Sequence, residues 1–171
     1  MYFEKWGFKK LCINVKNESD QFEWAFTGIY GPNLNRKHQF IWEELAGLNS
    51  WWNLPWCLRG DLNVIHFPLE RLEMGSSTCC MNDFSDFISL HVLTDNPLEG
   101  GLYTWSNSNS TSRIDWFLFS LVLVEYFTHF SQKRLRRVLS DHFPILLESR
   151  SHQRAQIPFR LRICGWNRRG F

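Results

Sequence analysis

The chain has 171 residues, of which 44% are hydrophobic and 16% aromatic, and its formal net charge at pH 7 is +2. This length and composition predict one folded domain with a sizeable core and exclude an intrinsically disordered chain. So small a net charge does not by itself indicate a nucleic-acid partner.

The first part of the chain predicts a β-hairpin, a helix and a short strand. Residues 10–16 and 22–31 are rich in β-branched and aromatic side chains and flank the polar turn NESDQ, so we expect them to pair. Over 36–51, apolar residues recur at helical spacing and predict a helix with one face on a sheet. The apolar residues 56–58 then predict a short strand directly before the segment RGDLNVI.

The remainder predicts a second helix and further strands. The helix is expected to begin near Asn82, and strands are expected at 112–120, 127–135 and 143–149. Strands that alternate with two or three helices, without an internal repeat, predict a layered α/β domain with a mixed or largely antiparallel sheet. We place this domain at 1–149.

The end of the chain differs in composition from the rest. Six arginines and no carboxylate occur between Arg150 and Arg169, and the periodicity of the preceding strands fades. We therefore expect 150–171 to form a basic, loop-like tail. Such a tail could contact phosphates or could simply be solvated.

The cysteines and the hydropathy pattern bear on the compartment. The five cysteines are odd in number and form no CxxC pair, which favours a reducing, intracellular compartment and argues against a zinc site. Apolar runs fall short of the about 20 residues of a membrane span, and charged residues interrupt the N-terminus. We expect a soluble protein of the nucleus or cytoplasm with no membrane partner.

Three aspartates share one kind of position. Asp61 follows the expected strand at 56–58, Asp115 lies inside SRIDWFL, and Asp141 directly precedes FPILL. An unpaired carboxylate is costly to bury among apolar residues, so three such positions suggest that the carboxylates meet around a cation. Oxygen ligands in that number suit Mg²⁺ or Mn²⁺. The adjacent His142 adds a group that titrates near neutral pH.

Each of these residues also has a purely structural interpretation. Asp61 and Asn63 could stabilise a turn, since Asp and Asn favour turns. Asp115 could be a single core aspartate that is paired with nearby backbone. The pair at 141–142 could cap a turn at the edge of the core, and Tyr30 could be ordinary packing at a strand end.

Four segments, in the order TGIYGPN, GDLNVI, SRIDWFLFS and LSDHFPILL, resemble the endonuclease/exonuclease/phosphatase superfamily of DNase I and the apurinic endonucleases. RGDLNVIHFPLERL and PLEGGLYTWSN are similar to the endonuclease domain that plant LINE-type (non-LTR) retrotransposons encode together with a reverse transcriptase. The similarity runs from about Phe22 to Phe159. It implies a four-layer α/β sandwich of the DNase I-like type.

The resemblance implies roles for individual residues. Asp61 would position or deprotonate the attacking water, and Asn63 would donate to the phosphate. Asp115 would orient His142, which would stabilise the negative charge that builds up on the scissile phosphate. Tyr30 would contact the phosphate through its hydroxyl.

The resemblance implies less specific roles for four residues. Asp141 and Asp61 match carboxylates of the metal or phosphate site, and Arg113 and Trp105 would lie at a DNA-facing rim. The implied reaction is the Mg²⁺- or Mn²⁺-assisted hydrolysis of a DNA phosphodiester, which nicks one strand and leaves a 3′ hydroxyl that can prime reverse transcription.

The chain departs from the family pattern at both ends. The family's early asparagine and the glutamate of its QE motif, a principal metal ligand, are not found before Tyr30. We therefore expect an N-terminally truncated domain that lacks the first strands and whose activity is weak. Residues 161–165 also match a one-base slip in the reading frame typical of the plant elements, so the tail is interpreted as loop-like or frameshifted.

Three functional hypotheses follow. The first is a metal-dependent, DNA-nicking endonuclease of a retroelement, impaired in this chain. The second is a non-catalytic relic that binds nucleic acid weakly through its basic end. The third is a phosphatase that acts on small phosphate esters. The sequence leaves the oligomeric state open.

Overall fold

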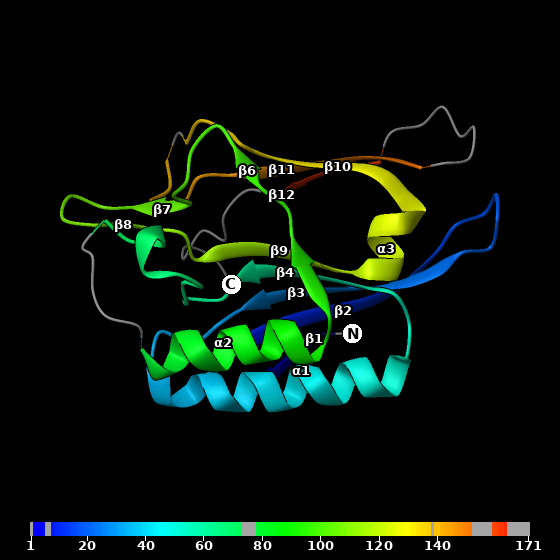
Figure 1. The fold of residues 1–171 in the computed structure, drawn as a ribbon, viewed down its shortest axis with the longest axis horizontal. Helices are drawn as coiled ribbons and strands as arrows, with labels where there is room; N and C mark the ends of the chain where they lie inside the picture. The colour runs from blue at the N-terminus through cyan, green and yellow to red at the C-terminus, as the bar shows by residue number, and fades with distance from the viewer. Residues whose placement is uncertain (1, 6–7, 73–77, 138, 152–158, 164–171) are drawn as a thin grey trace.

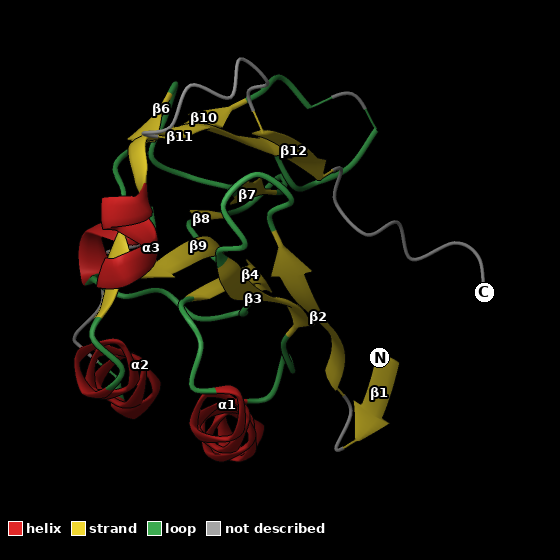
Figure 2. Cartoon of the chain, turned by 90° about the vertical axis from the view of Figure 1, so that its right-hand side faces the viewer, coloured by secondary structure: helices red, strands yellow, loops and turns green. Residues whose placement is uncertain are grey.

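The computed structural model describes residues 2–5, 8–72, 78–137, 139–151 and 159–163. Two β-sheets face each other, and two helices lie on the outer side of the larger sheet (Figure 1; Figure 2). The helices and strands in chain order are β1 Tyr2–Lys5, β2 Phe8–Lys16, β3 Glu23–Tyr30, the 3-10 turn η1 Asn35–Lys37, α1 His38–Trp52, β4 Trp56–Asp61, the 3-10 turn η2 Pro68–Glu70, α2 Cys79–Leu90, β5 Leu93–Asp95, β6 Leu98–Glu99, β7 Trp105–Ser106, β8 Thr111–Ser112, β9 Asp115–Ser120, α3 Leu121–Tyr126, β10 Phe127–Arg134, β11 Ile145–Ser151 and β12 Phe159–Ile163.

Both sheets are mixed, as the sequence predicts. The larger has the order β1-β2-β3-β4-β9-β5, in which β3 and β4 run parallel while the other pairs are antiparallel. The smaller has the order β12-β11-β10-β6, with β6 parallel to β10. Strands β7 and β8 form a separate two-stranded ribbon. The expected hairpin is confirmed as β2 and β3, and α1 provides the crossover that parallel pairing of β3 and β4 requires.

The larger sheet has an apolar core on each of its faces. On one face, residues of α1 and α2 such as Ile41, Leu45 and Phe84 pack against Trp116 and its neighbours. On the other face, aromatic residues of β3 and β9 pack against β10 and β11. Alternate side chains of a strand therefore enter different cores, which explains why β9 is buried over nearly its whole length.

Several element boundaries differ from the sequence prediction. The second helix begins at Cys79 rather than near Asn82, because the Thr78 side chain caps it by accepting a hydrogen bond from the Met81 N–H. The strand predicted at 56–58 continues to Asp61. The short helix α3 was not predicted: its six residues are mostly apolar and too few to show helical periodicity.

The tail and the outer layer also differ from expectation. The structure continues β11 to Ser151 and pairs 159–163 with it as β12, whose sequence FRLRI alternates between apolar and charged residues as strands do. The rest of the expected basic tail, 152–158 and 164–171, lies outside the described residues. Of the four expected layers, three are seen: within the described part, no helix covers the outer face of the smaller sheet (Figure 2). No described helix is both long and apolar enough to pass through a membrane.

Candidate active site

Three polar side chains form a row across the larger sheet. Asp61 at the end of β4 lies opposite Asp115 at the start of β9 and opposite Tyr30 at the end of β3. Side chains two or four positions apart on a strand share a face, and Cys57 and Phe117 both lie in the core between the sheets. The row therefore faces the smaller sheet.

The segment GDLN has a tight local geometry. A Cβ atom on Gly60 would lie 1.8 Å from the carbonyl oxygen of Ile29, so glycine is required for β3 and β4 to approach here. Beyond the strand, the Asn63 N–H donates to Asp61 Oδ1 over 3.0 Å, with Asn63 at a left-handed φ of 52°. The Asn63 side-chain amide donates to the Gly31 carbonyl over 3.0 Å. Its expected contact with a phosphate stays a prediction.

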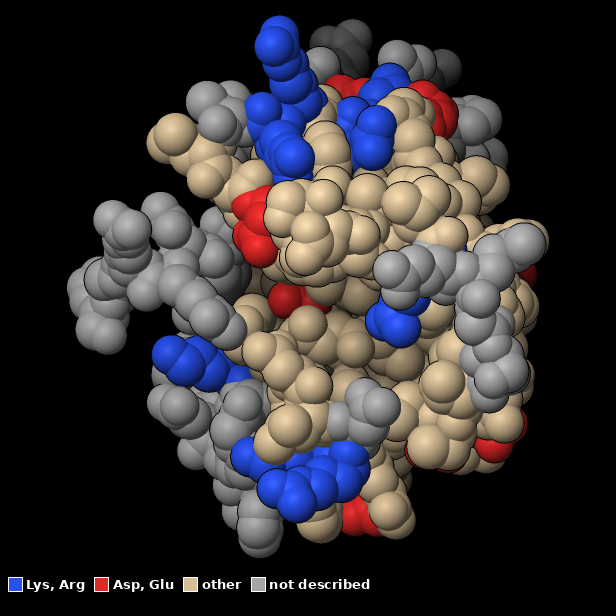
Figure 3. All heavy atoms as spheres, turned by 90° about the vertical axis from the view of Figure 1, so that its left-hand side faces the viewer, with Lys and Arg blue, Asp and Glu red and all other residues tan. Residues whose placement is uncertain are grey.

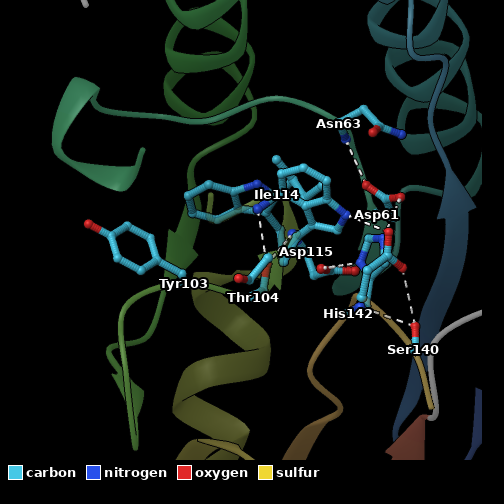
Figure 4. A network of polar contacts seen from close by, with 12 residues as sticks. Asp61, Asn63, Tyr103, Thr104, Ile114, Asp115, Ser140 and His142 are labelled. Carbon is cyan, nitrogen blue, oxygen red and sulfur yellow. Dashed lines mark hydrogen bonds and ion pairs between the residues drawn. The ribbon is translucent and has the colours of Figure 1, made fainter. Parts of the chain in front are cut away.

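His142 reaches this row from the segment that precedes β11. Its Nδ1 lies 2.8 Å from Asp115 Oδ2, and its Nε2 lies 3.8 Å from Asp61 Oδ2 (Figure 4). The His142 backbone N–H donates to the Ser140 hydroxyl over 3.1 Å. The His142 side chain remains 18% exposed, so the imidazole can meet a ligand while it holds Asp115.

Thr104 is a residue of the site that sequence reasoning missed. It is fully buried, and its Oγ1 accepts hydrogen bonds from the N–H groups of both Ile114 and Asp115 at 3.0 Å. Its carbonyl accepts from the Phe143 N–H over 2.7 Å. Thr104 thus joins the strand that carries Asp115 to the segment that carries His142. A threonine inside GGLYTWSN gives no local signal of these long-range contacts.

The electrostatics of the cluster favour a shared proton. Burial, and then the charge of Asp115, raise the pKa of Asp61 to about 7. Burial alone would lower the pKa of His142, but the hydrogen bond to Asp115 and the charges of Asp115, Asp61 and Asp141 outweigh it and raise that pKa. Asp61 therefore exchanges its proton near neutral pH, and His142 retains its proton to a higher pH than a free imidazole does.

Arg59 is a second residue that was missed. It lies two positions before Asp61 and so on the same face, and its guanidinium carbon is 5.5 Å from the centre of the Phe117 ring. Burial lowers its pKa, while the charges of Asp115 and Asp61 oppose that shift. Strand alternation in the sequence could have identified this half-buried cation beside the paired carboxylates.

Trp105 and Asp141 are brought together. The Trp105 indole N–H donates to Asp141 Oδ2 over 2.8 Å, and Trp105 lies directly opposite His142 in an isolated β-bridge. Partial burial alone would raise the pKa of Asp141, but the Trp105 hydrogen bond and the charge of His142 outweigh it, so this pKa lies below its usual value. Trp105 is half-buried and occupied by this contact.

The placement of Arg113 at a DNA-facing rim is wrong. Its side chain is buried, where it pairs with Asp95 at 2.8 Å and Glu70 at 3.4 Å and stacks on the Trp116 ring. Glu70 also accepts hydrogen bonds from the backbone of His66 and the next residue. Arg113 therefore fixes the loop after β4 within the fold. Its two acidic partners are distant in sequence, which is why the pattern SRID did not reveal them.

The residues described do not by themselves complete a magnesium site. Asp61 and Asp115 offer oxygens, but within the described ranges no three His, Cys, Asp or Glu side chains are placed to hold one ion. Asp141 directs Oδ2 to Trp105, and its Oδ1 lies 3.5 Å from the Ser140 hydroxyl. Mg²⁺ usually needs carboxylates together with water and substrate oxygens in octahedral geometry.

The end of the molecule that carries the cluster is hollowed and edged with cations. Figure 3 shows this end, with red atoms set back in a hollow and blue side chains toward the margins. Four cations on segments that adjoin the cluster, which we call the basic rim, are Arg36, Lys37, Arg71 and Arg137. Arg36 and Lys37 follow the end of β3, Arg71 bridges to Ser112, and Arg137 donates to the Asp141 carbonyl.

No protein-family model matches the chain, and no curated protein matches its sequence. Solved structures do match. The endonuclease domain of TRAS1, a telomere-specific non-LTR retrotransposon, aligns with a TM-score of 0.66 and 13% identity over 84% of this chain and 64% of that one. An endonuclease/exonuclease/phosphatase family protein from Bacteroides thetaiotaomicron aligns with a TM-score of 0.57 and 20% identity over 81% of this chain and 54% of that one.

A third match is the 3′ phosphatase NExo from Neisseria bound to product DNA hairpin, with a TM-score of 0.58 and 18% identity over 83% of this chain and 65% of that one. The chain thus spans between about half and two thirds of these structures. Their likeness confirms the fold that the sequence motifs predict, an α/β fold of the DNase I-like, endonuclease/exonuclease/phosphatase type.

Proposed function

We propose that the chain carries the hydrolytic centre of a phosphodiesterase that acts on DNA, of the kind that nicks DNA for a retroelement. The observation that carries the proposal is the convergence of Asp61, Asp115 and His142 from three distant segments onto one hollowed end. Titratable groups with shifted pKa values in a concave site, here Asp61 and His142, are typical of hydrolytic enzymes.

In this proposal each group has a task. His142 donates from Nδ1 to Asp115, so its Nε2 is left for the substrate and carries a proton when the ring is charged. A water held by Asp61 would attack phosphorus and give its proton to Asp61, while the phosphorus–oxygen ester bond breaks and the leaving 3′ oxygen takes a proton from solvent water. A carboxyl with a pKa of about 7 is suited to this exchange at neutral pH. The Nε2–H would stabilise the charge that builds up on the phosphate.

DNA is the substrate that the surroundings favour. The basic rim surrounds the acidic cluster, so a polyanion can approach it although the chain as a whole is nearly neutral. Two of the matched structures are a retrotransposon endonuclease domain and a phosphatase bound to DNA. Tyr30 and Asn63, beside the cluster, are proposed to contact the scissile phosphate.

Dependence on Mg²⁺ or Mn²⁺ is part of the proposal and rests on the resemblance alone. Because the residues described leave the ligand set incomplete, we expect this chain to nick DNA slowly. A substrate phosphate would add oxygen ligands that the side chains lack, so metal binding is expected to be stronger in the presence of DNA than in its absence.

A supercoiled-plasmid assay tests the function. The chain is incubated with Mg²⁺ or Mn²⁺, and relaxed circles are counted beside His142→Ala and a control, His66→Ala, at a half-buried histidine outside the cluster. Slow nicking that His142→Ala abolishes and His66→Ala preserves supports the proposal. Equal nicking by all three proteins identifies a contaminating nuclease and refutes it.

The two other hypotheses make different predictions. A non-catalytic relic binds DNA with an affinity that depends steeply on salt but not on Asp61→Ala. A phosphatase for small esters releases phosphate from p-nitrophenyl phosphate faster than it cleaves bis(p-nitrophenyl) phosphate. The proposed phosphodiesterase shows the opposite order.

A further inference from the structure

The segment that carries His142 has little regular structure of its own. Within the described residues between β10 and β11, Leu139 is 96% exposed, and the regular contacts are the isolated bridge at His142 and a hydrogen bond from the Leu135 N–H to the Pro144 carbonyl. The position of an imidazole on such a segment must be set by what the segment touches. A shift of about 1 Å is enough to lower catalytic efficiency considerably.

Hydrogen bonds at three places attach this segment to residues 104–106. The Ser106 N–H donates to the Asp141 carbonyl over 2.9 Å, and the Phe143 N–H donates to the Thr104 carbonyl over 2.7 Å. Arg137 donates to the carbonyls of both Ser106 and Asp141. These contacts place Trp105 directly opposite His142.

One side-chain contact closes this attachment. The Trp105 indole N–H donates to Asp141 Oδ2 over 2.8 Å, and a hydrogen bond to an ionised carboxylate is stronger than one between neutral groups. The contact joins the residue opposite His142 to the residue directly before it. Breaking it frees the segment on the side that faces solvent, while the core contacts of β9 remain.

We propose that Trp105 and Asp141 form a latch that positions His142 against Asp115, so that Asp141 acts as a positioning residue rather than as a metal ligand. The inference rests on the proposed function, in which His142 is catalytic. It assigns Asp141 from its observed partner in place of the role that the family resemblance implies. Both members of the latch lie outside the Asp61–Asp115–His142 cluster itself.

The tautomer of His142 provides a test that needs neither substrate nor metal. A neutral imidazole whose Nδ1 donates to Asp115 holds its proton on Nδ1, whereas a free imidazole distributes it between both nitrogens. Long-range proton–nitrogen NMR spectra of the histidine-labelled chain at alkaline pH report this distribution through the carbon-bound ring protons. His142→Gln identifies the signal.

We expect the unmodified chain to show the Nδ1–H tautomer. Trp105→Phe, which keeps the ring and removes the N–H, should shift His142 toward the mixture of tautomers found in a free imidazole. Asp141→Ala should do the same. Asp141→Asn, which keeps an oxygen acceptor for the indole, should restore the unmodified signal. Trp51→Phe, at an indole that is 76% exposed on α1, is the matched control and should change nothing.

Two results would overturn the latch. One is an unchanged Nδ1–H tautomer in Trp105→Phe, in spectra whose backbone amide signals show a folded chain. The other is an Asp141→Asn spectrum that matches Asp141→Ala, because charge rather than the indole contact would then be decisive. Since neither measurement involves cleavage, failure of the latch and absence of nicking are separate outcomes.

Discussion

Asp61 shows most directly how burial produces a reactive group. An aspartate in water loses its proton near pH 4, but here burial and the opposing Asp115 move the pKa to about 7. Between those pH values the folded chain retains a proton that the unfolded chain releases. The folded state therefore binds more protons, and the free energy of unfolding falls as pH rises through this range.

Asp61→Asn tests this account. The amide keeps an oxygen for the Asn63 N–H but cannot ionise. The substitution therefore removes the contribution of Asp61 to the fall in the free energy of unfolding with rising pH. Relative to the unmodified chain, we expect Asp61→Asn to gain a few kcal/mol of stability between pH 4 and pH 8, at about 1.4 kcal/mol per pKa unit. Urea unfolding at several pH values measures the gain. Asp83→Asn, at an exposed carboxylate of α2, is the control, and a stability difference for Asp61→Asn that does not change with pH would contradict the account.

His142 also contributes to the fall in the free energy of unfolding with rising pH. Its pKa is raised in the folded chain, so the stability that its proton contributes is complete below pH 6.5 and is lost as pH rises through the higher folded value. Asp115→Asn removes the hydrogen-bonded carboxylate and should lower the pKa of His142. An NMR titration of the His142 ring protons measures the shift, and an unchanged pKa would mean that Asp115 is not its main partner.

Thr104 shows how a single hydroxyl supports two segments. Thr104→Val keeps the shape but leaves the N–H groups of Ile114 and Asp115 without their acceptor. We expect a loss of about 2–6 kcal/mol in the free energy of unfolding, because each of the two unsatisfied buried donors costs about 1–3 kcal/mol. Thr104→Ser retains the acceptor and should lose about 1 kcal/mol. Equal losses for both variants in urea unfolding would argue that packing, rather than the hydroxyl, is decisive.

Among the elements, the β3–β4 pair is the most constrained. Gly60→Ala would place a methyl group on the Ile29 carbonyl, so the two strands must separate, and we expect a loss of more than about 3 kcal/mol. Gly47→Ala in α1 is the matched control: its Cβ meets nothing within 4 Å, and it should stabilise the helix by about 0.5–1 kcal/mol. Thermal unfolding of both variants decides the point.

The sequence predicted those elements whose signal is local. The hairpin, both long helices and the strands that carry the aspartates follow from periodicity and turn residues. β12 was missed because the arginines of 150–169 were interpreted as a basic tail, although Phe-Arg-Leu-Arg-Ile alternates between apolar and charged residues as strands do. Asp61, Asp115 and His142 were predicted through the order of their motifs. Arg113 was misplaced because its partners Glu70 and Asp95 come from other loops.

At the scale of the whole molecule, charge distribution matters more than net charge. The chain is close to neutral, yet Lys and Arg side chains gather at the end that holds the cluster (Figure 3). If phosphates meet the basic rim, Arg36→Gln and Arg71→Gln should each weaken duplex binding for all sequences and reduce the salt slope by about 1.

Fluorescence anisotropy with a labelled duplex over a series of KCl concentrations measures these slopes. The control is Lys16→Gln, at an exposed lysine of the β2–β3 hairpin that pairs with Glu23. If Lys16→Gln reduces the salt slope of duplex binding as much as Arg36→Gln does, the DNA-binding surface lies elsewhere.

The separation of the cluster's members along the chain has a consequence for biosynthesis. β4 and β9 supply their carboxylates early, whereas the imidazole belongs to a segment just before β11. A ribosome-bound chain that has not yet released residue 142 therefore holds two acidic groups without their histidine.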